Sequence, residues 1–234
     1  GAVLEGTGAG TILLKIAWRL TGGLRGGPAH AAVVASSMFG TFSGSSAANV
    51  VGTGVFTIPM IKKRGFSNAF AGGIEAAAST GGQFTPPVMG AAAFMIADLT
   101  GEGYVKVALA ALMPAVFYYA SLFCAVSVEA VRNGIKPVPS EQRQILSRHD
   151  VFLSSILILP ILTIIGVLLM GRSAAMAGFW ATIIGAVLGF LNPEFRRQPQ
   201  RLLISLIRGG EQCGKIMVAV AAVGIVIGAV NQTG

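Results

Sequence analysis

Hydrophobic residues in this chain gather into long uncharged runs instead of alternating with polar ones. Residues 107–128, 151–171 and 173–191 each hold about the 20 apolar residues with which a helix crosses a hydrocarbon core of ~30 Å. Backbone groups inside a bilayer must pair internally, which long helices achieve and short strands outside a barrel do not. The pattern therefore predicts an all-α, polytopic integral membrane protein.

One apolar run, residues 28–61, is interrupted in its centre by the small and polar stretch SGSSAAN at 43–49. A single helix over these 34 residues would be ~51 Å long, whereas two arms of about 15 residues would each reach ~22 Å and stop short of crossing. Basic residues flank both ends of the run, so both ends are expected on the cytoplasmic side. We therefore expect a re-entrant helical hairpin with residues 43–49 at its tip.

A second interruption, STGGQFTPP at 79–87, lies within the apolar segment 66–98. Here we expect a membrane span that breaks at Gly81-Gly82 and restarts at Thr85-Pro86, with threonine as the N-cap and proline at the first helical position. Irregular backbone at membrane depth is tolerated where it is buried in protein or lines a wet cavity, so two breaks indicate a site. Glu75, just before this break, is either a functional intramembrane acid or a hydrogen-bonded structural group.

The rest of the chain is expected to complete one membrane domain, with a basic cytoplasmic loop as the seam between two halves. Gly1 is not an initiating residue and no signal segment opens the chain, so we expect an interior piece of a longer protein. The expected organisation is a first half at 1–131, with an interfacial helix in 1–27 and a span at 104–131; a loop at 132–150; and a second half at 151–234, with an interfacial stretch at 202–207 and an outward segment at 216–230.

Composition and charge support this class. Hydrophobic residues make up 53% of the chain and charged residues 11%, and the mean hydropathy is +0.74, outside the soluble globular range. The net charge is +8, but the basic residues cluster between the spans, which is typical of cytoplasmic loops and not of a nucleic-acid surface. Cys124 and Cys213 have no metal or redox spacing and are interpreted as buried small hydrophobes.

The two breaks together offer groups for a cation and for an anion. Helix arms that end near 40–43 and 79–81 present carbonyls, and arms that begin near Ala47 and Pro86 present N–H groups, with partial charges of about half an electron at each end. Neutral oxygens in the breaks suit a small hard cation such as Na⁺, the coupling ion and the only cofactor expected. The candidate ion- and substrate-binding residues are Ser43, Ser45, Ser46, Asn49, Thr80, Gly81, Gly82, Gln83, Thr85, Pro86 and Pro87, among which Ser45, Asn49 and Gly81 are the expected Na⁺ ligands.

The stretches SGSSAANVVGTGVFTIPMIKKRGF and FAGGIEAAASTGGQFTPPVMGAAAFMIAD resemble the large membrane subunit of TRAP (tripartite ATP-independent periplasmic) transporters, and most closely the type in which small and large membrane subunits are fused. The resemblance is dense over about 1–120 and looser over 151–234. It implies an elevator-type, Na⁺-driven uptake permease of the ion transporter superfamily. It also implies a second, inverted copy with its own hairpin and break; neither is present before Gly234, so we expect the second repeat to be truncated before its hairpin. The implied location is the cytoplasmic (inner) membrane of a bacterium or archaeon.

The same resemblance implies partners and a site. The partners are a periplasmic solute-binding protein, a small membrane subunit, fused or separate, and an organic anion as solute. Residues 43–49 would form the first hairpin tip and residues 80–87 the unwound helix facing it, and together they would make the first Na⁺ site and part of the substrate site.

Several alternatives stay open. A sodium/anion symporter of another family in the same superfamily would need no binding protein, and a passive channel or membrane scaffold would not accumulate solute. In a further alternative, the two interruptions lie in ordinary membrane spans, and their glycines and hydroxyls serve helix packing. An intramembrane hydrolase using Ser45 or Ser46 lacks a base, because His30 and His149 are far off in the sequence, so we expect no enzymatic activity.

Overall fold

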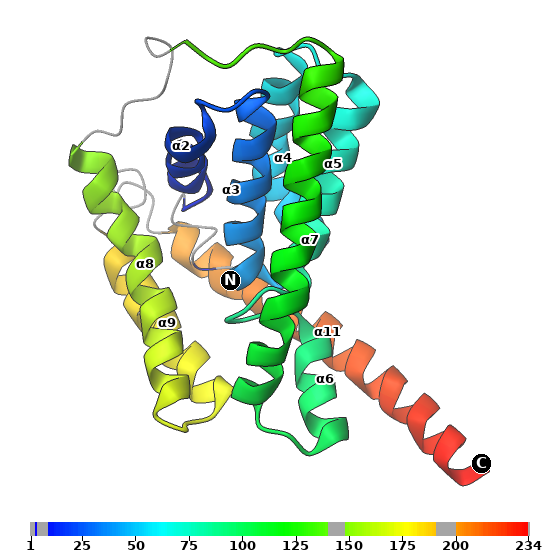
Figure 1. Cartoon of the computed structure of the whole chain (residues 1–234). Helices are drawn as coiled ribbons and strands as arrows, with labels where there is room; N and C mark the ends of the chain where they lie inside the picture. Colours follow the sequence, from blue (N-terminus) through cyan, green and yellow to red (C-terminus); the bar gives the residue numbers. More distant parts are fainter. Residues whose placement is uncertain (1–2, 4–8, 140–147, 191–199, 234) are drawn as a thin grey trace.

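The computed structural model describes residues 3, 9–139, 148–190 and 200–233, and within them every regular element is a helix (Figure 1). The all-α prediction is therefore confirmed. The helices in chain order are α2 (Ala9–Thr21), α3 (Gly27–Ser43), α4 (Ser46–Lys62), α5 (Asn68–Gly81), the 3₁₀ turn η1 (Gly82–Phe84), α6 (Ala91–Thr100), α7 (Tyr104–Arg132), α8 (Arg148–Leu169), α9 (Ala174–Gly189) and α11 (Gln200–Thr233).

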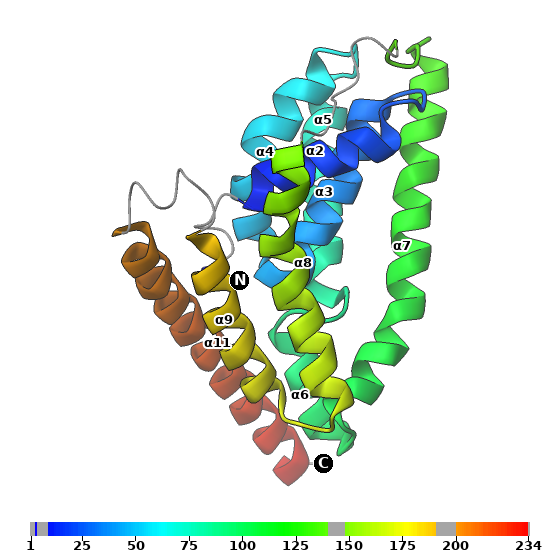
Figure 2. The ribbon, with the colours of Figure 1, turned by 90° about the vertical axis from the view of Figure 1, so that its left-hand side faces the viewer.

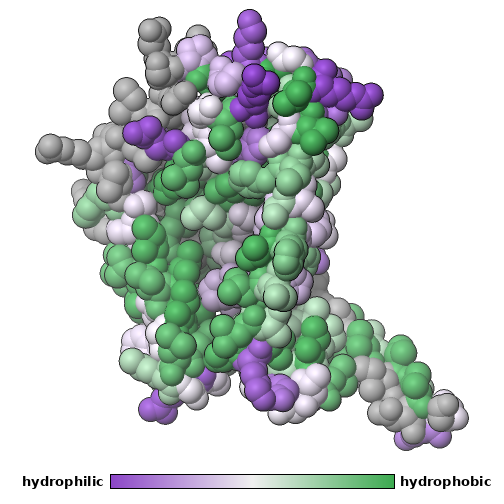
Figure 3. Space-filling view, viewed as in Figure 1, coloured by the Kyte–Doolittle hydropathy of each residue, from purple (hydrophilic) through white to green (hydrophobic). Residues whose placement is uncertain are grey.

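Two segments, Tyr104–Arg132 and Phe152–Leu169, are long and apolar enough to cross a bilayer. The side of α7 that carries Leu109, Met113 and Phe117 faces outward, with these side chains 66–69% exposed. Figure 3 shows apolar residues covering most of the visible surface between the two ends of the helices. Such a surface is favourable against lipid chains and unfavourable in water, in agreement with an integral membrane protein.

α3 and α4 form a helical hairpin whose connection is only two residues long. α3 ends where Gly44 adopts a left-handed backbone (φ 63), and its N–H donates to Gly40 O at 3.1 Å. α4 begins where Ser45 Oγ accepts a hydrogen bond from Ala48 N at 3.3 Å. The tip is thus shorter than expected, because residues 46–49 already form the first turn of α4.

α5 packs against both arms of this hairpin, and α7 lies along α3 and α5 (Figures 1 and 2). The shared core contains many small side chains, each almost completely buried: Ala29, Ala32, Ala71, Ala78 and Ala130. Small residues let helix backbones approach closely, which is the main source of helix association in apolar surroundings. The hairpin, α5 and α7 therefore form one tightly packed group.

α2 lies against α3 and α8 through a second core. Leu13 of α2 is fully buried and packs with Phe39 and Leu157. On the same helix Lys15 Nζ lies 2.7 Å from Asp150 Oδ1, at the start of α8. The helix expected at the membrane interface is therefore packed into the bundle along one face.

Charged residues gather at the two ends of the helices. At one end the α2–α3 turn, the start of α5 and the end of α7 meet, since a Cβ on Gly26 would lie 3.0 Å from Phe66 and 2.9 Å from Ala130. The basic residues in the turns at this end are Arg25, Lys62, Lys63, Arg64, Arg132 and Lys136. Their grouping agrees with the cytoplasmic side predicted from the charge pattern.

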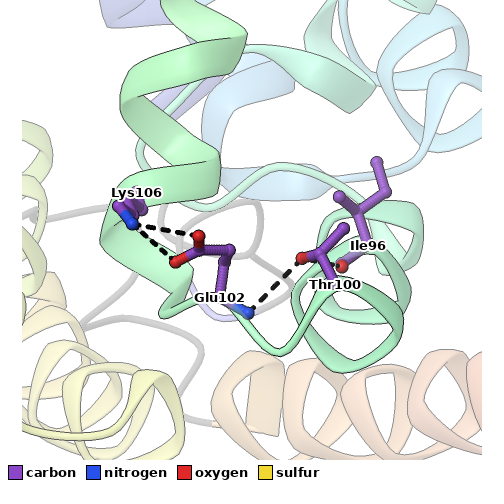
Figure 4. A network of polar contacts seen from close by, with 4 residues as sticks. All are labelled: Ile96, Thr100, Glu102 and Lys106. Carbon is purple, nitrogen blue, oxygen red and sulfur yellow. Dashed lines mark hydrogen bonds and ion pairs between the residues drawn. The ribbon is translucent and has the colours of Figure 1, made fainter.

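The opposite end includes the turn between α6 and α7 (Figure 4). Gly101 (φ 67) ends α6 in a left-handed conformation, and Glu102 N then donates to Thr100 Oγ1 at 3.4 Å. Glu102 also accepts a hydrogen bond from Lys106 Nζ at 2.8 Å, one turn into α7. These contacts set the sharp reversal between the two helices.

Three expectations need correction. The interfacial stretch at 202–207 and the outward segment at 216–230 belong to one continuous helix, α11, because glycines inside a helix cost only about 1 kcal/mol each and do not break it. Cys124 on α7 and Cys213 on α11 are exposed and not buried, and Cys213 lines the cavity described below. The loop expected at 132–150 starts after α7 and ends at Arg148; residues 140–147 lie outside the described part.

Gly26→Ala should lower the melting temperature of the full-length protein more than Gly134→Ala. Both positions have a left-handed backbone (φ 70 and 64), so both alanines introduce roughly 1–2 kcal/mol of strain. Only at Gly26 would the new Cβ also meet packed neighbours, Ala130 and Phe66, whereas nothing lies within 4 Å at Gly134. Thermal unfolding in detergent, followed by tryptophan fluorescence, checks this, and equal melting temperatures would contradict the packing at this end.

Candidate functional site

The broken helix has a wider gap than the sequence predicts. α5 ends at Gly81, η1 follows, and Thr85 takes an extended conformation (φ −89, ψ 120) because the residue before a proline is disfavoured in a helix. The expected restart at Thr85-Pro86 is wrong: α6 begins at Ala91, after Gly90 as its N-cap residue. Proline has no backbone N–H group to donate within a helix, so two successive prolines delay the start of α6.

The hairpin and the broken helix meet at a contact between two glycine backbones. A Cβ on Gly40 would lie 2.3 Å from Gly82 Cα, and a Cβ on Gly82 would lie 2.4 Å from Gly40 Cα. No other residue fits at either position without movement of a helix. α3 and η1 therefore touch at the point where α5 loses its helical conformation, and we call this contact the glycine crossing.

Hydrogen bonds join the two breaks beyond the glycine crossing. Val88 N donates to Thr41 O at 3.2 Å, and Gln83 Nε2 donates to Ser46 Oγ at 3.1 Å. Gly44 at the tip lies so close to the break that a Cβ there would be 2.7 Å from Met89 O. The two interruptions far apart in the sequence thus face each other.

A cavity of about 440 Å³ lies beside these contacts. Its wall includes Phe42, Ser43 and Gly44 from the hairpin tip and residues 88–90 from the break; α6, α9 and α11 contribute the other side. None of the described lining residues carries a formal charge. Polar groups at this cavity are backbone amides and carbonyls, hydroxyls and the amide of Gln212.

The predicted site residues are not all in one place. Ser43 lines the cavity, Ser46 and Gln83 bond to each other, and Gly82 forms the glycine crossing. Thr80 instead is exposed and donates to Ala76 O at 2.8 Å, one turn back on α5. The carbonyl of Pro87 accepts a hydrogen bond from Tyr104 Oη of α7 at 3.0 Å. Pro86 is half-buried in the turn between η1 and α6.

The three expected Na⁺ ligands each have a partner inside the protein. Ser45 Oγ caps α4, and Gly81 O accepts a hydrogen bond from Thr85 Oγ1 at 2.7 Å. Asn49 is fully buried, and its Nδ2 donates to Ser36 O at 2.7 Å. Nδ2 is also the atom nearest the glycine crossing, 3.2 Å from the position of a Cβ on Gly40. The Na⁺ ligand set stays a prediction.

Two tyrosines of α7 hold the end of α5 and were not singled out from the sequence. Tyr118 Oη donates to Ala77 O at 2.8 Å, and Tyr119 Oη donates to Ala78 O at 3.0 Å. A Cβ on Gly81 would lie 2.6–2.8 Å from these two rings. These bonds fix the end of α5 at the carbonyls of residues 77 and 78; the carbonyls expected to be open for a ligand, at 79–81, come just after them.

Glu75 is the hydrogen-bonded group that the sequence allowed as one of two interpretations. It is fully buried, and four hydroxyl groups donate to its carboxylate. The donors are Ser36 at 2.9 Å, Thr53 at 2.5 Å, Thr57 at 2.6 Å and Ser79 at 3.3 Å. We call these five residues the Glu75 cluster. The sequence held one signal for this cluster: Thr53 and Thr57 are four residues apart, as are Glu75 and Ser79. Residues with this spacing share one face of a helix.

His30, near the start of α3, is buried against α7. Its Nδ1 lies 3.2 Å from Gly26 O and its Nε2 3.1 Å from Ser127 Oγ. The ring also packs on Phe123, with ring centroids 4.9 Å apart. These contacts give His30 a structural role at the base of α3.

Two interrupted membrane segments that face each other beside a cavity are typical of secondary membrane transporters. The whole chain, residues 1–234, matches the family described as "Tripartite ATP-independent periplasmic transporter, DctM component". The chain therefore belongs to the TRAP transporter family, as part of a large membrane subunit. The resemblance to that subunit is thereby confirmed, whereas the fused type stays a prediction.

Named relatives agree with this assignment. The chain is 30% identical over 167 residues to "Uncharacterized protein y4mL" of Sinorhizobium fredii, covering 70% of this chain and 39% of that one. It is 43% identical over 75 residues to the C4-dicarboxylate TRAP transporter large permease protein DctM of Vibrio cholerae, covering 32% and 17%. It is 26% identical over 194 residues to the sialic acid TRAP transporter large permease protein SiaM of Vibrio cholerae, covering 80% and 44%. The chain spans less than half the length of each of these relatives.

Gly40→Ala should destabilise the full-length protein by about 1–3 kcal/mol, because the added methyl group would overlap the backbone of Gly82. Gly73→Ala is the matched control on α5: nothing lies within 4 Å of its Cβ position, and alanine favours a helix, so stability should be unchanged or slightly higher. Thermal unfolding of the two purified variants compares them. An unchanged Gly40→Ala variant would show that the two breaks are not in contact.

Proposed function

We propose that this chain is part of the permease subunit of a Na⁺-coupled, secondary active uptake system for organic acids, which a periplasmic solute-binding protein delivers. The proposal rests on membership in the TRAP family together with one observation. The tip of a helical hairpin and the unwound part of a second helix face each other beside an uncharged cavity. The C4-dicarboxylate and sialic acid permeases among its relatives both carry solutes with carboxyl groups.

The helix ends at the two breaks supply the charges that such a site needs. α3 and α5 end there with their carbonyl groups, which carry partial negative charge and favour a cation. α4 and α6 begin there with N–H groups, which favour an anion such as a carboxylate. Na⁺ and solute thus bind at adjacent helix ends of opposite polarity, so that each stabilises binding of the other.

An uncharged cavity also suits alternating access. A lysine or arginine in the wall would bind an organic anion in both the presence and the absence of Na⁺, and coupling would be lost. Because the described lining residues are neutral, the charge of the bound Na⁺ is a large part of the attraction for the carboxylate. Na⁺ binding therefore precedes tight solute binding in this scheme.

The hairpin and α5 are expected to move as one body in an elevator-type cycle. The glycine crossing and the Glu75 cluster tie both arms of the hairpin to α5, so that the two breaks keep their mutual geometry during movement. A small membrane subunit is expected to work with this unit. Transport of this kind needs no covalent chemistry.

Asn49→Ala should raise the Na⁺ concentration for half-maximal uptake by about tenfold, the equivalent of ~1.4 kcal/mol in binding. The side chain is buried beside the glycine crossing, and its loss would loosen the tip. The measurement is solute uptake by the full-length permease in proteoliposomes, with its small subunit and binding protein, as a function of the Na⁺ gradient. Asn133→Ala, at an exposed asparagine after α7, is the control and should behave as wild type. An unaltered Na⁺ dependence in Asn49→Ala would reject the site.

Uptake should also require the cognate binding protein. Proteoliposomes with the permease alone are expected to show no solute accumulation above background, whereas addition of the loaded binding protein restores it. Robust Na⁺-driven uptake by the permease alone would instead favour a sodium/anion symporter of another family. Ion flux without saturable accumulation would favour a passive channel.

A further inference from the structure

The Glu75 cluster connects both arms of the hairpin to α5 through one carboxylate. Ser36 comes from α3, Thr53 and Thr57 from α4, and Ser79 shares α5 with Glu75. All five side chains are at most 3% exposed. The described contacts of the carboxylate are all with hydroxyl groups, without a lysine or arginine. A buried carboxylate that accepts four hydrogen bonds fixes the positions of its donors, because the loss of any one of them would leave a buried acceptor short of a partner.

Asn49 of the hairpin tip is part of a closed ring with this carboxylate. Its Nδ2 donates to Ser36 O at 2.7 Å, and Ser36 Oγ donates to Glu75 Oε1 at 2.9 Å. On the other side, Thr53 Oγ1 lies 3.2 Å from Asn49 Oδ1 and 2.5 Å from the same Glu75 oxygen. The ring therefore runs from Asn49 through Ser36, Glu75 and Thr53 back to Asn49.

The hydroxyl of Thr53 links the carboxylate to the amide of Asn49. Thr53 Oγ1 lies within hydrogen-bond distance of both Glu75 Oε1, at 2.5 Å, and Asn49 Oδ1, at 3.2 Å. The amide stays in its orientation because only Nδ2 can donate to Ser36 O. Oδ1 therefore faces Thr53, and Nδ2 faces the glycine crossing.

We propose that Glu75 is a positioning residue for cation binding: through Thr53 and Ser36 it holds the side chain of Asn49 in one orientation at the base of the hairpin tip, and so sets the Na⁺ affinity of the site. This inference rests on the proposed Na⁺-coupled function and assigns a residue that controls it. Glu75 lies outside both breaks and does not itself contact the ion.

The chain offers a matched pair of variants to test this role. Thr53 and Thr57 lie one turn apart on α4, both are buried, and both donate to the carboxylate of Glu75, at 2.5 Å and 2.6 Å. Only Thr53 also contacts Asn49; Thr57 donates to Glu75 Oε2 and to the backbone carbonyl of Thr53. Thr53→Val and Thr57→Val therefore each remove one hydroxyl from the carboxylate, but only the first releases Asn49.

The experiment measures Na⁺ binding to the purified full-length protein by the shift of its melting temperature in NaCl, with choline chloride keeping the ionic strength constant. Both valine variants should lose similar stability in choline chloride. Thr53→Val should raise the Na⁺ concentration for the half-maximal shift about tenfold, whereas Thr57→Val should stay within about twofold of wild type. Thr53→Ser, which retains the hydroxyl, should restore the wild-type value.

The outcomes separate this inference from the proposed function. Two results would overturn the positioning role alone, provided that the wild-type protein responds to Na⁺. One is an equal change of the half-maximal Na⁺ concentration in the two valine variants; the other is a Thr53→Ser variant that does not restore the wild-type value. A wild-type protein whose melting temperature does not respond to Na⁺ would overturn the Na⁺-coupled function and this inference with it. A rise in the half-maximal Na⁺ concentration that occurs in Thr53→Val, but not in Thr57→Val or Thr53→Ser, would support the inference.

Discussion

The contact between the backbones of Gly40 and Gly82 is the constraint on which the site depends. Two helix segments approach until neither position has room for a Cβ atom. This approach brings the hairpin tip against the unwound part of the following helix, so that ends of opposite polarity from four helices meet at one place. Without it the hairpin and the broken helix would each be an unusual membrane segment, and their polar groups would have no common ligand.

Around this contact the protein uses short, buried polar links in place of large apolar side chains. Two tyrosines of α7 bond to carbonyls near the end of α5, and the carboxylate of Glu75 collects hydroxyls from three helices. In an apolar environment an unpaired polar group is costly, so such links fix relative positions more strictly than alkyl packing does. These links hold the hairpin and α5 together as one body, as the proposed elevator movement would require.

The sequence predicted the helices, the hairpin and the existence of both breaks, because the bilayer imposes helix length and small polar residues are distinct within apolar runs. It did not predict where α6 begins, since Thr85-Pro86 looks like a helix start and only the second proline and Gly90 delay it. It also did not predict which site residues come together. Thr80 points outward and Asn49 presents its amide nitrogen to the glycine crossing, and both facts depend on partners from other helices that no local pattern encodes.

The central claim is that the hairpin tip and the break share a Na⁺ ion. A high-resolution cryo-electron microscopy map of the full-length permease in saturating NaCl, compared with one in choline chloride, tests it most directly. We predict a spherical density in NaCl, surrounded by oxygen atoms from residues 43–49 and 80–87 and absent in choline chloride. Well-ordered oxygens in both segments with no such density between them in NaCl would contradict the account.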